Sequence, residues 1–301
     1  MMDPLPTGHQ PVLLAEVLEA LQPSPGQTFI DCTIGRAGHA LEFAKRLGPS
    51  GLLVGLDADP RNLEYAQTRL SAASCRVRLF HANFAELDDV IAEIGQPTVN
   101  GILADLGVST NQLFDNAYGL SFSSDMPLDM RLDPRIDKTA ADLVNSMPCD
   151  DLANVLYELA QERYSRQIAR IIVEARRSSP ITSTERLAQL VRRAIPSRGK
   201  SREKIDPATR TFLALRMKVN REMENLQALL EQGPGFLSRG GRLGVISFQS
   251  MEDRMVKQAF RSAEQTGLLR ITTPKPLVPS DSEIAANPRS RSAKLRVVER
   301  Q

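Results

Sequence analysis

The sequence predicts an α/β protein with a doubly wound, Rossmann-like sheet and an inserted helical domain. Three observations predict this class. Short apolar runs alternate with helical patterns early in the chain, the alternation then stops, and it resumes before the C-terminus. We therefore predict one sheet domain formed by residues 1–111 and 210–301, with a helical domain over residues 112–209 between its two parts.

The first part of the predicted sheet contains four strands separated by helices. The apolar runs place strands at residues 29–32, 52–56, 76–80 and 99–105. Helical patterns between them cover residues 37–47, 61–70 and 86–94. Strands that alternate with helices through short connections are typical of a parallel sheet covered on both faces.

The predicted insertion is helical because its apolar residues recur at spacings of three and four. Leu152, Val155, Leu156 and Leu159 form one such set, and Ile168, Ile171 and Ile172 form another. The opposite side has a basic stripe of Arg163, Arg166, Arg170 and Arg177 with acids between them, a pattern that a salt-bridged, exposed face also explains.

The pattern after the insertion predicts one long helix with an apolar face from Phe212 to Leu230. It then predicts a strand at 242–248, a helix at 251–263, and closing strands at 268–272 and 295–298. The apolar helix serves either the core or a dimer, so the oligomeric state stays open between monomer and homodimer.

The composition argues against several protein classes. No apolar run reaches the 18 or more residues that a membrane span needs, and residues 1–8 lack a signal-peptide pattern, so we expect a cytoplasmic protein. The three cysteines are far apart and the three histidines form no HxxxH pair, so we expect neither a disulfide framework nor a metal site. Basic runs at 192–204 and 289–300 indicate either solvated surface or an RNA-facing surface.

A glycine turn after the first strand predicts a cofactor site. The chain there is Gly35-Arg-Ala-Gly38-His39, and the second strand ends in Asp57. A helix N-terminus beside a carboxylate suits a ligand with a ribose. The middle glycine of the GxGxxG pattern that dinucleotide-binding folds use is absent. The site therefore favours S-adenosylmethionine, which has a ribose but no phosphate, with Asp57 accepting hydrogen bonds from the ribose hydroxyls.

Two further residues follow strand ends, where ligands lie in such folds. Phe84 follows the third strand and either contacts an adenine ring or packs in the core. Asp105 ends the fourth strand, which predicts a role near the methionine group or the acceptor.

Several long motifs closely resemble the MraW (RsmH) family, bacterial methyltransferases that modify the N4 amine of a cytosine in the decoding centre of 16S rRNA. The motifs begin with His9-Gln-Pro-Val-Leu-Leu14 and continue with Asp105-Leu-Gly-Val-Ser-Thr-Asn-Gln-Leu113, Gly119-Leu-Ser-Phe122, Pro127-Leu-Asp-Met-Arg131, Pro207-Ala-Thr-Arg-Thr-Phe212, Ser247-Phe-Gln-Ser-Met-Glu-Asp-Arg254 and Asn287-Pro-Arg-Ser-Arg-Ser-Ala-Lys-Leu-Arg296. They cover nearly the whole chain.

The resemblance implies a methyltransferase sheet and a set of cofactor-binding residues. This set is Gly35, Ala37, Gly38, His39, Asp57, Phe84, Asp105 and Gln112. Three positions depart from the family pattern, with Ala37 in place of glycine, Gln249 in place of histidine, and Ala160-Gln161-Glu162 in place of Gly-Glu-Glu. A positive φ at Ala37 would strain it by about 1 kcal/mol.

Methyl transfer to cytosine N4 requires a group that accepts from the amine, because its lone pair is delocalised into the ring. Asp105 is the first candidate for this catalytic role and Asp129 the second. The insertion and the basic C-terminal segment are expected to bind 16S rRNA within the small ribosomal subunit. The sequence leaves open whether the substrate is naked rRNA or the assembled subunit. The candidate phosphate contacts are Arg131, Arg254, Arg289, Arg291 and Arg296.

Three alternatives accompany this interpretation. An NAD-dependent oxidoreductase would need a true GxGxxG and a catalytic base pair, which the sequence lacks. An RNA-binding assembly factor with a degenerate cofactor pocket is favoured by Ala37 and Gln249. A methyltransferase for DNA or another RNA site is distinguished only by substrate assays.

Overall fold

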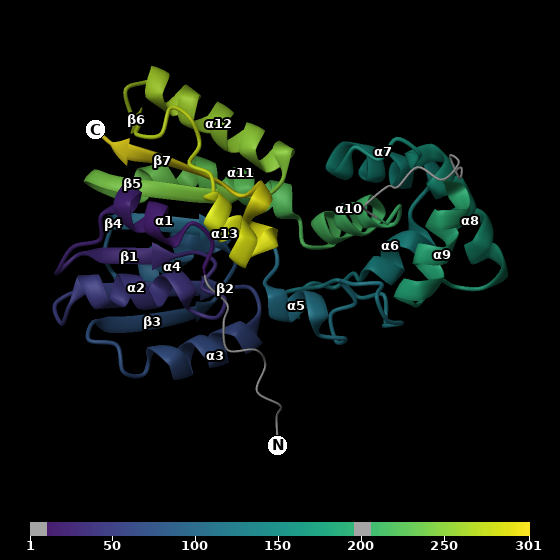
Figure 1. The fold of residues 1–301 in the computed structure, drawn as a ribbon, viewed down its shortest axis with the longest axis horizontal. Coiled ribbons are helices and arrows are strands. Elements are labelled where there is room, and N and C mark those ends of the chain that lie inside the picture. The colour runs from purple at the N-terminus through teal and green to yellow at the C-terminus, as the bar shows by residue number, and fades with distance from the viewer. Residues whose placement is uncertain (1–10, 196–205) are drawn as a thin grey trace. The chain divides into compact units, whose positions relative to one another are not determined.

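The computed structural model describes residues 11–195 and 206–301. The chain divides into two compact units, a sheet unit formed by residues 1–107 and 223–301 and a helical unit formed by residues 108–222. Figure 1 follows the chain from the first part of the sheet unit through the helical unit and back. The first residues of the opening motif (9–10) and most of the basic run at 192–204 lie outside the described residues.

The sheet unit contains a seven-stranded sheet in the order β3-β2-β1-β4-β5-β7-β6 (Figure 1). Its strands are β1 (Thr28–Asp31), β2 (Leu52–Asp57), β3 (Arg76–His81), β4 (Val99–Asp105), β5 (Leu237–Ser247), β6 (Leu269–Ile271) and β7 (Lys294–Arg300). Strands β1 to β5 are parallel to one another, and β7 runs antiparallel to its two neighbours, β5 and β6. All seven predicted strands are present, but the sheet is not wholly parallel, because β7 lies between β5 and β6 and runs in the opposite direction.

Helices pack on both faces of this sheet, which confirms the doubly wound class. Residues from α1 (Leu14–Leu21), α2 (Gly38–Leu47) and α3 (Pro60–Leu70) share one apolar core with the sheet. Residues from α4 (Leu87–Ile94), α11 (Glu222–Gln232) and α12 (Ser250–Gln265) share the other. The short helix α13 (Asp281–Ala286) precedes β7.

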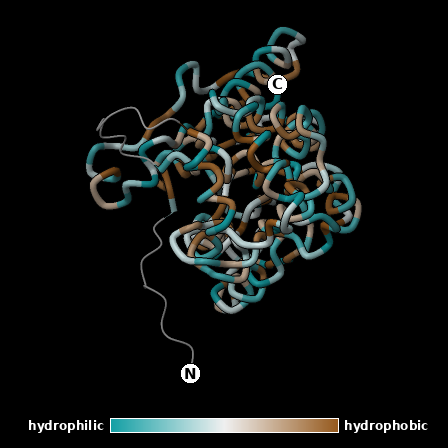
Figure 2. The backbone as a smooth tube through the Cα atoms, turned by 90° about the vertical axis from the view of Figure 1, so that its right-hand side faces the viewer, coloured by the Kyte–Doolittle hydropathy of each residue, from teal (hydrophilic) through white to brown (hydrophobic). Residues whose placement is uncertain are grey.

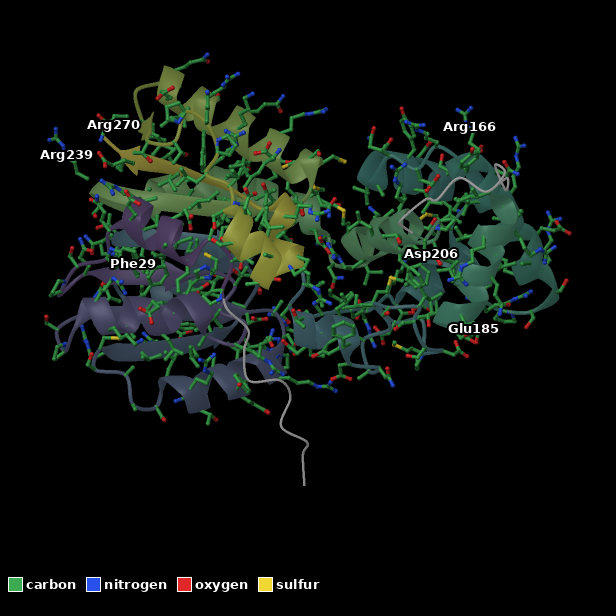
Figure 3. The ribbon with its side chains drawn as sticks, viewed as in Figure 1. Phe29, Arg166, Glu185, Asp206, Arg239 and Arg270 are labelled. Atoms are coloured by element: carbon green, nitrogen blue, oxygen red, sulfur yellow. The ribbon has the colours of Figure 1, made fainter. Side chains whose placement is uncertain are left out.

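The helical unit has its own core, as the spacing of its apolar residues predicts. Its helices are α5 (Thr110–Phe114), α6 (Ala140–Ser146), α7 (Cys149–Ala160), α8 (Ser165–Ser178), α9 (Thr184–Ala194) and α10 (Thr209–Val219). Leu152, Leu156, Ile168 and Ile172 are fully buried in this core. The predicted basic stripe lies on the exposed side of the unit, where Figure 3 labels Arg166.

The prediction of a single long helix from Phe212 to Leu230 is wrong. The chain forms α10 and α11 instead, and the break falls at Arg221, which has a φ of +51°. Asn220 stabilises the break: its side-chain nitrogen donates to the Met130 carbonyl at 2.8 Å, and its oxygen accepts from the Leu132 N–H at 2.9 Å.

This break also moves the end of the insertion. Phe212 and Leu215 pack in the core of the helical unit, whereas Leu226 and Leu230 pack in a core of the sheet unit. The helical unit therefore extends to residue 222, past the predicted end at residue 209.

No helix among residues 11–195 and 206–301 has both the length and the hydropathy that a membrane span requires. In Figure 2, hydrophobic and hydrophilic stretches alternate along the chain trace, as expected where each helix has one buried side.

Candidate functional site

The glycine turn joins the carboxyl end of β1 to the first residue of α2. Gly35 has a φ of +49°, a conformation that favours glycine. A Cβ on Gly38 would lie 3.0 Å from the Pro11 Cβ, so a larger residue here would require Pro11 to shift by a few tenths of an ångström. Ala37 has a φ of +59° and a ψ of +34°, so it adopts the left-handed conformation that the family pattern fills with glycine. The turn keeps its shape at the cost of backbone strain in Ala37.

Asp57, the last residue of β2, faces this turn. Its Oδ2 accepts from the Gly35 N–H at 2.8 Å and from the Asn62 side chain at 3.2 Å. Its Oδ1 accepts from the Asp59 N–H at 2.9 Å. The carboxylate therefore links the glycine turn to β2. A carboxylate oxygen can accept further hydrogen bonds, and a ribose hydroxyl would donate one of them.

Asp105, the last residue of β4, lies beside His39. Its backbone N–H donates to the Thr33 Oγ1 at 2.7 Å, which fixes the end of the strand. Its Oδ2 is 4.0 Å from His39 Nδ1, and its buried Oδ1 has no hydrogen-bond partner. Since His39 Nε2 lies 2.9 Å from the Val12 carbonyl oxygen, that nitrogen must carry a proton.

Three carboxyl groups gather at the carboxyl ends of β1, β2 and β4, and burial raises the pKa of each. The pKa of Asp31 is raised to about 7 and that of Asp57 to about 6, although backbone N–H donors act against burial in both. Burial raises the pKa of Asp105 to about 8, and the nearby charges of Asp31 and Glu252 add to this. A cationic ligand placed here would relieve the crowding of negative charge.

These acids do not form a metal-binding arrangement. Within the described ranges, no group of three or more His, Cys, Asp or Glu side chains is placed to hold a metal ion. The edge of the sheet thus offers buried acceptors for an organic cation and backbone N–H groups at the start of α2.

Comparison with known proteins assigns this edge to a family. A model of the MraW methylase family matches residues 6–301. The chain belongs to this family. A ribosomal RNA small subunit methyltransferase H from Syntrophotalea carbinolica is 47% identical over 97% of this chain and 98% of its own length. Its counterpart in Geobacter sulfurreducens is 46% identical over the same shares, and that in Syntrophobacter fumaroxidans is 44% identical over 100% and 99%.

As a member of the MraW methylase family, the protein uses S-adenosylmethionine as its methyl donor. The observed site fits this cofactor, because its sulfonium and ammonium charges match the acidic edge and the unpartnered Oδ1 of Asp105. Phe84 starts a short 3-10 helix after β3 and packs partly against the apolar core, which leaves part of its ring exposed at the same edge.

Sequence reasoning missed three residues at this edge. Asp31 is 1% exposed and ends β1. Glu252 accepts hydrogen bonds from the Phe248 and Gln249 N–H groups. Thr33 accepts a hydrogen bond from the backbone N–H of Asp105. Asp31 had a signal in the sequence, since it ends an apolar strand as Asp57 and Asp105 do. Gln249, the departure from histidine, lies at the N-terminus of α12, where Glu252 caps its N–H.

Other predicted site residues lie in the helical unit. Gln112 is buried in α5, where its side-chain oxygen accepts from the Ser109 N–H and hydroxyl, and its role toward the cofactor stays a prediction. Asp129 accepts from Arg131 through both oxygens, at 2.8 and 2.9 Å, and Arg131 also donates to the Ile136 carbonyl. The two side chains therefore form an ion pair with each other, and the roles predicted for them stay predictions.

The remaining predicted phosphate contacts lie in the sheet unit. Arg254, Arg289 and Arg291 are exposed, as RNA contact requires. Arg296 is only 8% exposed, and its Nε donates to Asp253 at 2.7 Å, so it is not a simple surface contact.

Proposed function

We propose that the protein transfers a methyl group from S-adenosylmethionine to the N4 amine of a cytosine in the decoding centre of 16S rRNA. The full-length match to relatives named ribosomal RNA small subunit methyltransferase H supports an rRNA substrate. The cytosine N4 position follows from the motifs that resemble the MraW family. The observation that carries the chemistry is the partly buried Asp105, whose buried Oδ1 has no partner.

In this proposal each residue of the edge has one task. The turn from Gly35 to His39 presents backbone N–H groups and holds the amino-acid end of the cofactor, while Asp57 accepts from its ribose and Phe84 packs on its base. When bound, S-adenosylmethionine supplies an electrophilic methyl group and a positive charge.

Asp105 is the proposed acceptor for an N4 hydrogen. A cation beside it lowers its raised pKa, so the carboxylate form is available when the site is filled. An ionised carboxylate that accepts from N4–H increases the electron density on that nitrogen and orients its lone pair. Asp129 is the second candidate, but both of its oxygens already accept from Arg131.

The proposed RNA surface comprises the exposed arginines of each unit. In the helical unit this surface includes the exposed Arg163, which precedes α8, and Arg166 and Arg170, which lie in it; in the sheet unit it includes the exposed Arg254, Arg289 and Arg291. The target base must leave its local stack to reach a carboxylate at the end of a sheet strand.

The test is transfer of labelled methyl to unmethylated small ribosomal subunits and to naked rRNA, followed by mass spectrometry of the nucleosides. We expect N4-methylcytidine from the wild type and from Asp129→Asn, and a loss of at least a hundredfold in Asp105→Asn with cofactor still bound. A product other than N4-methylcytidine would overturn the proposed position. Cofactor binding without any transfer would instead favour an RNA-binding assembly factor.

A further inference from the structure

A surface hollow in the sheet unit lies between α12 and the edge formed by β6 and β7. It encloses about 250 Å³ of space, part of it open to solvent. Three of its lining side chains are cationic: Lys257, Arg261 and Arg296. Phe260 and Ile271 supply apolar walls, and Thr273 closes one side.

The cations come together through the periodicity of α12 and the pleat of β7. Asp253, Lys257 and Arg261 follow one another at intervals of four residues, so they share one face of the helix. On β7, Lys294 and Arg296 are two residues apart and both bind Asp253, at 3.1 and 2.7 Å. The single carboxylate of Asp253 therefore accepts hydrogen bonds from two cationic side chains of the strand.

Arg296 gives the hollow a fixed donor. Its side chain is 9% exposed, and its Nε is held by Asp253. The Thr273 hydroxyl accepts from the Val297 N–H at 2.8 Å, which fixes the wall beside Arg296. Glu264 lies near the rim, where its carboxylate accepts from the Ile271 N–H. The charge of the lining itself stays positive.

We propose that this hollow binds a phosphate group, and that the phosphate belongs to the RNA strand close to the methylated base. A guanidinium held on one side and two cations on a helix face suit an anion with several oxygens. The second half of the inference rests on the proposed function.

The sheet register relates the position of the hollow to the reaction edge. Asp105 pairs with Ile246, and Ile246 pairs with Leu295, the residue before Arg296. Two strand spacings, about 10 Å, separate Asp105 from Leu295. The hollow lies further away, because β6 is one strand beyond β7 and because Lys257 and Arg261 follow the start of α12 by about two and three turns. A phosphate in the hollow would therefore belong to a nucleotide a few positions from the acceptor, and its binding would fix the path of the strand.

The test compares a double variant, Lys257→Gln with Arg261→Gln, with a control, Arg239→Gln. Arg239 is exposed near the start of β5, away from the carboxyl edge, as Figure 3 shows. Binding of a fluorescent rRNA fragment is measured by anisotropy at several salt concentrations, and binding of inorganic phosphate by ³¹P NMR. Because neither readout needs turnover, the result does not depend on which base is methylated.

We expect the double variant to weaken RNA binding about tenfold, to lower the salt slope by about 0.7, and to leave cofactor affinity unchanged. The control should match the wild type. If only inorganic phosphate binding falls, the hollow is a site for free phosphate and the RNA assignment is overturned. If neither binding changes, or if the control loses as much as the double variant, the hollow is not a phosphate site. Failure of methyl transfer with this RNA effect intact would refute the proposed function alone.

Discussion

Ala37 offers a direct test of whether this chain tolerates its departure from the family's glycine turn. The left-handed conformation costs alanine about 1–2 kcal/mol, which Ala37→Gly would recover. Glycine would lose about 0.7 kcal/mol through chain entropy and about 0.8 kcal/mol through loss of a fully buried methyl group. The terms nearly cancel, so we expect Ala37→Gly to change the free energy of unfolding by less than about 0.5 kcal/mol.

A second alanine, in the helix that follows Ala37, isolates the conformational term. Ala44 is 2% exposed, lies inside α2 and packs in the same core. Ala44→Gly loses the same chain entropy and methyl burial terms but recovers no backbone strain, so it should lower the free energy of unfolding by about 1.5–2 kcal/mol. The difference between the variants then equals the strain at Ala37.

Urea unfolding of both variants, followed by circular dichroism, measures this difference. The affinity for S-adenosylmethionine, measured by calorimetry, should stay within twofold of the wild type in Ala37→Gly, because the turn already has its shape. Equal destabilisation of the two variants would refute the strain argument. A large gain in affinity on introducing glycine would indicate a degenerate pocket.

Three further predictions follow from the hydrogen bonds and the charges. Asp57→Ala should weaken cofactor binding, measured by calorimetry, at least tenfold. Asn62→Ala keeps the carboxylate and should have a small effect. Equal losses of affinity in the two variants would mean that the geometry of the turn, rather than the carboxylate, binds the cofactor. Because the folded pKa of Asp105 is raised to about 8, the stability that its neutral form contributes is complete below about pH 3.8 and is lost as the pH rises through 8. Asp105→Asn should therefore raise the melting temperature relative to the wild type more at pH 8 than at pH 4, and a constant difference would contradict the raised pKa. Asn220→Ala should destabilise the helical unit by about 2–3 kcal/mol in a denaturant titration, because the Leu132 N–H and the Met130 carbonyl lose their partner. As a control, replacing the exposed Asn154 with alanine should cost less than about 0.5 kcal/mol. Similar costs for the two variants would show that Asn220 does not stabilise the break.

Most of the sheet unit could be predicted because its signals are local. Strands β1 to β4 are short apolar runs bounded by turns, and all four were predicted to within one residue at either end. The orientation of β7 was not predictable in this way, since its partners β5 and β6 are chosen by tertiary packing. The same holds for the helix break at Arg221, where neither glycine nor proline marks the turn and the stabilising contacts come from residues about 90 positions earlier.

The residues of the candidate site were likewise predictable where the signal is local and not where it depends on tertiary structure. Asp57 and Asp105 were identified from their places at strand ends, and the structure brings both to one edge with Asp31. The pairing of Asp129 with Arg131 depends on the conformation of a loop, which no periodic pattern specifies. The hollow beside α12 required residues from three elements that are distant in sequence.

The break at Arg221 separates the hydrophobic core of the helical unit from the cores of the sheet unit. Since α10 packs in one and α11 in another, heat or denaturant can melt either unit while the other keeps its buried surface. A ligand that binds only the folded sheet unit would then raise the melting temperature of that unit alone. Calorimetry with and without S-adenosylmethionine should therefore separate two transitions in what is a single chain.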